Sequence, residues 1–144
     1  MSGVEPIPPI ELTVETRVSP AHAWQALTDP ERVALWFTTA TPVGPVGTPY
    51  RLDFGEGRVV AGIATALEPG ERFGYTWCWE GAGDGPSEET RVEWRVSALP
   101  SGGSRIALVH DGWAEGGSNV VARDDHEAYW SGYLDDLRDV LDEG

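Results

Sequence analysis

The sequence predicts an α+β fold in which a curved antiparallel sheet of about six or seven strands wraps one long C-terminal helix. Segments that alternate apolar and polar residues follow one another from residue 10 to residue 110, and turn residues separate them. Two helix-start signals interrupt this series after the first segment. The last segment instead repeats its apolar residues at helical spacing. A one-sided sheet and an amphipathic helix each need a partner, so we expect them to pack together.

The first strand and the two short helices are predicted from residues 10–37. Apolar residues alternate with Glu, Thr and Arg over residues 10–18, which is typical of a half-buried strand. Ser19-Pro20 and Asp29-Pro30 each place a capping residue before a proline, so two helices should begin there. Residues 1–9 contain three prolines and are predicted to be a flexible lead-in. We expect the remainder, residues 10–144, to form a single domain.

The strands of the meander are predicted around residues 50–54, 58–67, 73–79, 91–96 and 106–110, after a loop over residues 40–49. Period-two alternation places four aromatic rings on one face of the third of these segments: Phe73, Tyr75, Trp77 and Trp79. That face should look toward the C-terminal helix.

The C-terminal helix is predicted to run from about residue 125 to residue 142. Asp124 with Glu127 three residues later resembles a capping box. A stripe at helical spacing follows, made of Trp130, Leu134, Leu137 and Leu141.

The amino-acid composition limits the classes of partner that the protein is expected to bind. The chain has 144 residues, a formal net charge of -14, and arginine as its only strongly basic residue. Such an acidic protein repels phosphate backbones and anionic lipids, so we expect neither nucleic acid nor a membrane as partner. Cys78 is the single cysteine, and the N-terminus lacks the pattern of a signal peptide. We therefore expect a cytoplasmic protein whose oligomeric state is open.

Several motifs resemble the helix-grip superfamily of START domains and birch-pollen allergens, also called SRPBCC. They are Gly47–Leu52, Pro69–Trp79, Arg105–Trp113 and Trp130–Leu137. Within the superfamily the sequence is most similar to the family named for the activator of the heat-shock protein 90 ATPase. The resemblance implies a cavity between the sheet and the long helix. Tyr129 stands where such helices often carry Gly, so it should narrow the mouth of that cavity.

The aromatic residues are the predicted ligand-binding set. Rings on the concave face could stack on an apolar ligand, while indole N–H and phenol O–H groups orient it. The predicted site residues are Trp77, Trp79, Trp94, His110, Trp130 and Tyr133. A plain aromatic core explains the same periodicity, and the sequence leaves that alternative open.

His110 is the single candidate for catalysis. It continues the inward phase of its strand, so an imidazole there could orient a ligand carbonyl or act as a general base. The alternative is a core histidine bonded to the backbone or to a tyrosine hydroxyl. The run Asp124-Asp125-His126-Glu127 looks like a set of metal ligands, but successive helical residues point about 100° apart and cannot converge. We expect no metal and no cofactor.

Three functions remain at this stage. The leading one is binding of a small, largely apolar molecule that contains an aromatic ring. The second is an enzyme of the polyketide cyclase or aromatase type, which the superfamily includes, with His110 and either Tyr75 or Tyr133 moving protons. The third is a chaperone-interaction module that meets a protein partner through its acidic surface.

Overall fold

The computed structural model describes residues 7–42, 44–80, 89–113 and 117–143, with side chains in the last segment described from Val120 onward. The elements in chain order are β1 (Ile10–Thr16), α1 (Pro20–Thr28), α2 (Pro30–Trp36), β2 (Thr39–Ala40), β3 (Pro49–Asp53), β4 (Val59–Glu68), β5 (Arg72–Glu80), β6 (Thr90–Ala98), β7 (Ser104–Asp111) and α3 (Gly117–Glu143).

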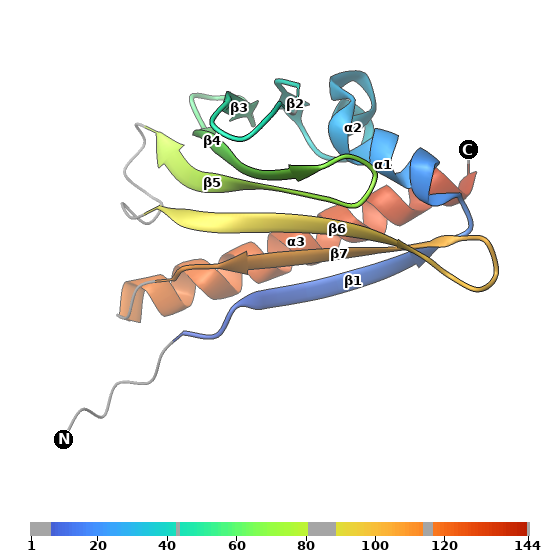
Figure 1. Ribbon diagram of the computed structural model, residues 1–144. Helices are drawn as coiled ribbons and strands as arrows, with labels where there is room; N and C mark the ends of the chain where they lie inside the picture. Colours follow the sequence, from blue (N-terminus) through green and yellow to red (C-terminus); the bar gives the residue numbers. More distant parts are fainter. Residues whose placement is uncertain (1–6, 43, 81–88, 114–116, 144) are drawn as a thin grey trace.

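The seven strands form one antiparallel sheet in the order β1-β7-β6-β5-β4-β3-β2. β1 pairs with β7, so that Ile10 lies opposite His110 and Thr16 opposite Ser104. The long helix α3 crosses one face of the sheet, and α1 with α2 lies near the C-terminal end of α3 (Figure 1). The predicted fold class is therefore confirmed. The two-residue strand β2 is the one element that the alternation did not predict.

Both short helices begin where the sequence places them. The Ser19 hydroxyl accepts a hydrogen bond from the His22 backbone N–H at 3.2 Å. The Asp29 carboxylate accepts one from the Glu31 backbone N–H at 3.1 Å. Each bond satisfies an N–H group that the first helical turn leaves unpaired.

α3 begins earlier than predicted, at Gly117, and Asp124 lies inside it. The reason is tertiary. The Arg123 guanidinium donates to the carbonyl oxygens of Pro8 and Pro9 at 3.1 and 3.0 Å and pairs with Glu127 at 2.9 Å. These bonds fasten the first turns of α3 to the chain just before β1. Of the predicted lead-in, residues 1–6 lie outside the described residues.

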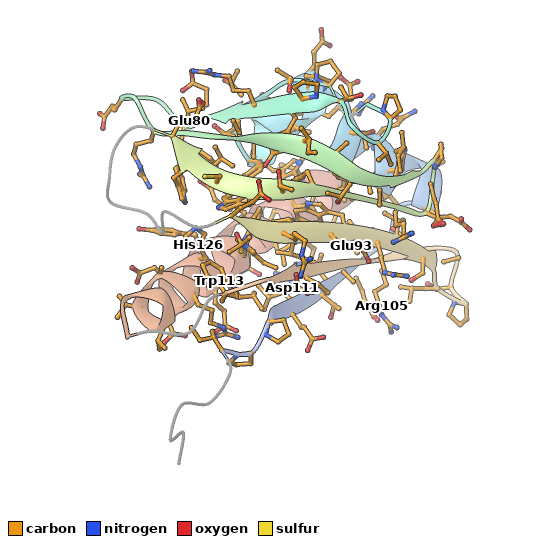
Figure 2. All side chains as sticks on the ribbon, turned by 60° about the vertical axis from the view of Figure 1, so that its left-hand side comes forward. Glu80, Glu93, Arg105, Asp111, Trp113 and His126 are labelled. Carbon is orange, nitrogen blue, oxygen red and sulfur yellow. The ribbon has the colours of Figure 1, made fainter. Side chains whose placement is uncertain are left out.

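The core lies between α3 and the concave face of the sheet. The predicted helix stripe is buried, with Trp130, Leu134, Leu137 and Leu141 each 3% exposed or less. The outer face of the sheet instead carries charges from β6 and β7, among them Glu93, Arg105 and Asp111 (Figure 2). Apolar residues inside and ion pairs outside explain the period of two in the sequence.

Trp130→Ala should lower the free energy of unfolding by about 3–5 kcal/mol, because the ring is 2% exposed and removal leaves a cavity. Trp130→Phe keeps most of the ring volume but loses the indole N–H, so its cost should be about 1–3 kcal/mol. Urea titration of both variants measures the two losses. A loss for Trp130→Ala below about 1 kcal/mol would exclude a core role for this side chain.

Candidate ligand-binding site

The indole N–H groups of β5 meet a histidine from α3. Trp77 and Trp79 both donate to His126 Nε2, at 3.3 and 3.0 Å. On the other side of the ring, His126 Nδ1 lies 2.7 Å from the Ala122 carbonyl oxygen. Nδ1 must therefore carry the proton, and Nε2 is the acceptor. His126 is thus a neutral imidazole that joins the helix to the sheet.

A second buried histidine, His110 on β7, has both ring nitrogens bonded within the protein. Its Nδ1 accepts from the Trp130 indole at 3.1 Å, and its Nε2 lies 2.7 Å from the Thr90 hydroxyl oxygen. That hydroxyl in turn donates to the Trp77 carbonyl oxygen at 3.3 Å. His110 Nε2 is therefore the proton-bearing nitrogen. The Trp113 indole closes the arrangement by donating to the His110 carbonyl oxygen at 3.1 Å.

The two imidazoles lie close together, with ring centroids 5.5 Å apart. Burial holds the pKa of His110 well below its ordinary value, and the neighbouring His126 lowers it further. Burial also lowers the pKa of His126, although its bond to the Ala122 carbonyl and the nearby Asp125 oppose that shift. Both rings are consequently neutral near pH 7, which is the state that their hydrogen bonds require.

His126 is one of the site residues that the sequence reasoning missed. Grouping it with its acidic neighbours hid its place four residues before Trp130, on the same helical stripe. It is 8% exposed and faces inward, whereas Asp124 and Asp125 are exposed. Figure 2 places His126 beside Trp113, in agreement with a ring-centroid distance of 5.2 Å. Within the described residues, no group of three or more His, Cys, Asp or Glu side chains could hold a metal ion.

Two hollows open beside this core. The first, called the α3 hollow, lies between α3 and β5 and holds about 540 Å³ of empty space, counted out to its mouth. Its lining consists of Phe37, Phe54, Arg58, Trp77, Trp79, His126, Tyr129, Trp130 and Tyr133. It therefore contains four of the six predicted ligand-binding residues. Tyr129, which was predicted to narrow a cavity mouth, is 60% exposed in this lining.

The second, called the α2 hollow, lies between the short helices and strands β2 to β6. It holds about 580 Å³ of empty space, counted in the same way, and none of the described residues that line it is charged. Its aromatic lining includes Trp94, Phe73, Tyr50 and Tyr75. Burial raises the pKa of both tyrosines, so their hydroxyls stay protonated. Trp94 thus lines a different hollow from the four residues above, although its ring contacts Trp130 at a centroid distance of 5.6 Å, and His110 lines neither hollow.

Among the residues that the structure describes, one cation lines the α3 hollow. The Arg58 guanidinium lies 5.3 Å from the centroid of the Trp79 ring, a cation–π geometry. Burial raises the pKa of the Tyr133 hydroxyl, and the nearby Arg58 charge partly offsets that rise. A molecule in this hollow could therefore contact aromatic rings, a phenol O–H and a guanidinium at the same time.

The family model described as "Activator of Hsp90 ATPase homolog 1-like protein" matches residues 17–142. The chain belongs to this family. Within the described residues, no helix of this family member is both long enough and apolar enough to cross a membrane. No curated protein matches the sequence.

Solved structures of similar fold agree with this assignment. DynU16, from the dynemicin biosynthetic locus, is 25% identical with a TM-score of 0.79 over 92% of this chain. The chain spans only 46% of that protein's length. A Mesorhizobium loti protein, MLL2253, is 19% identical with a TM-score of 0.83, over 93% of this chain and 96% of its own. The Aha1 dimer from Colwellia psychrerythraea is 18% identical with a TM-score of 0.75. The match covers 94% of this chain and 96% of that protein's chain.

Acid should destabilise the protein through these two histidines. The pKa values of both histidines in the folded protein lie below the ordinary 6.5. As pH falls below about 6.5, the unfolded chain therefore binds protons that the folded protein does not bind. The stability they provide is complete above about pH 6.5 and is lost as pH falls below that value, by up to about 1.4 kcal/mol per pH unit for each histidine.

His126→Gln keeps an acceptor for the indoles but removes one titrating group. Urea unfolding between about pH 5 and 7 should therefore give a shallower decline for the variant than for the wild type. Carboxylates titrate alike in both proteins, which makes the difference specific to His126. Identical slopes would contradict a neutral, buried His126.

Proposed function

We propose that the chain binds a small, largely apolar molecule with an aromatic ring in the α3 hollow. One observation carries this proposal: rings from the sheet and from the helix surround a single volume that also contains a guanidinium. Apolar walls with a few convergent polar groups are typical of small-molecule sites. The membership of the family and the helix-grip fold support the same function.

The rings are held in place before any ligand arrives. Trp77 and Trp130 lie 5.2 Å apart between ring centroids, and Trp79 stands perpendicular to Trp77 at 5.9 Å. Because both β5 indoles donate to His126, their orientation is fixed by the protein. A ligand therefore does not bear the entropic cost of ordering these side chains, which favours binding.

Arg58 indicates the polar end of the ligand. It is exposed at the hollow, over Trp79, in a protein whose formal net charge is -14. A guanidinium attracts carboxylate, phenolate or enolate oxygens, and the Tyr133 hydroxyl can donate to the same group. We therefore propose an aromatic ligand with one acidic or strongly accepting oxygen group.

The two other functions are less well supported. The likeness to DynU16 favours a role in small-molecule biosynthesis, and with it the cyclase alternative. His110, however, has no ring nitrogen left for a substrate and does not line the α3 hollow. A chaperone-interaction module is suggested by the family's name, and no described surface favours it over ligand binding.

Fluorescence titration with biphenyl-4-carboxylate tests the proposal, because the ligand should quench Trp77 and Trp79 saturably. Trp79→Ala removes one wall of the hollow and the ring beneath Arg58, so the affinity should fall about tenfold or more. Trp24→Ala is the matched control, since Trp24 is also half-buried but lines neither hollow. Equal affinities in the wild type and in Trp79→Ala would refute binding at this site.

A further inference from the structure

Among the described residues, Phe37 is the one residue that lines both hollows. It follows the last residue of α2 and is half-buried. Its ring contacts α3-hollow residues on one side, with centroids 4.8 Å from Tyr133 and 5.2 Å from Trp130. On the other side it stacks on Trp36 of the α2 hollow at 5.1 Å. Phe37 thus forms part of the wall between the two volumes, beside the contact of Trp94 in the α2 hollow with Trp130 in the α3 hollow, whose ring centroids lie 5.6 Å apart.

The backbone at this position is fixed, whereas the side chain is held by ring contacts. The Phe37 N–H donates to the Val33 carbonyl oxygen at 2.8 Å. The next residue, Thr38, donates its hydroxyl to the Asp53 carbonyl oxygen at 2.6 Å. A change of side chain or rotamer at Phe37 can therefore open the space between the hollows while α2 and β3 stay in place.

We propose that the α2 and α3 hollows are two compartments of one ligand site and that Phe37 sets the length of the ligand. This inference rests on the proposed function of the α3 hollow. With Phe37 in its present position, a ligand is confined to the α3 compartment. Without the ring, an elongated molecule reaches through to the α2 compartment.

The residues that line the two compartments indicate which end of the ligand lies in each. Arg58 lies in the α3 compartment, so the acidic group belongs there. The described lining of the α2 compartment contains no charged side chain, and its tyrosine hydroxyls are kept neutral by burial. An uncharged ring system suits that end, because an ion there would lose its hydration without a countercharge. The ligand class is therefore a rod-like aromatic acid whose length Phe37 limits.

The test compares two acids of equal width, biphenyl-4-carboxylate and the one-ring-longer p-terphenyl-4-carboxylate. The wild type should prefer the shorter acid by about tenfold or more, because Phe37 blocks the third ring. Phe37→Ala should bind the longer acid about tenfold or more tightly than the wild type does. Phe37→Leu, which removes less volume, should show a smaller gain and serves if Phe37→Ala does not fold.

Three variants test whether simply enlarging either compartment would raise the affinity for the longer acid. Phe54→Ala widens the α3 compartment alone and Leu52→Ala the α2 compartment alone, so neither should gain affinity for the longer acid. Adding Ala40→Phe to Phe37→Ala refills the α2 compartment and should abolish the gain. The reversal by Ala40→Phe is expected only if the third ring enters the α2 compartment.

The outcomes separate the two claims. Suppose that the wild type binds biphenyl-4-carboxylate, but Phe37→Ala gains no more affinity for p-terphenyl-4-carboxylate than Phe54→Ala does. The partition by Phe37 is then refuted, and the proposed function stands. If no variant binds either acid, both are refuted. A gain in Phe37→Ala that Ala40→Phe reverses establishes Phe37 as the residue that determines ligand length.

Discussion

The hydrogen bonds between tryptophan indoles and two buried histidines hold this fold together. A concave face built from so many indoles buries their N–H groups, and an unpaired buried donor is costly. His126 accepts from Trp77 and Trp79, while His110 accepts from Trp130. Each imidazole thereby ties a strand to α3. Because a neutral imidazole has one accepting nitrogen, both rings must stay uncharged for the arrangement to persist.

The same bonds shape the candidate site. Trp77 and Trp79, whose indoles donate to His126, line the α3 hollow together with His126 itself. The histidine bonds and the candidate site therefore share the same side chains. Packing that stabilises the sheet against α3 also orders the walls of the hollow, so stability and preorganisation have one cause.

Local patterns in the sequence predicted most of the fold. Alternation located the strands of the meander, and the Ser19-Pro20 and Asp29-Pro30 signals located both short helices. The misses depended on tertiary contacts. α3 extends back to Gly117 because Arg123 bonds to the residues before β1, and no local pattern shows such a partner. The separation of the two hollows likewise depends on the tertiary packing of Phe37, which no local pattern shows.

Charge further restricts what the site can accept. The net charge of -14 opposes the approach of anions, but at physiological salt its field is screened beyond about 8 Å. Within the α3 hollow, Arg58 acts at contact distance and escapes most of that screening. One guanidinium can offset one carboxylate, whereas a phosphate ester or a polyanion would keep an unpaired charge near an acidic surface. The protein's charge and its aromatic walls thus both favour the ligand proposed above, a mostly apolar molecule with a single acidic group.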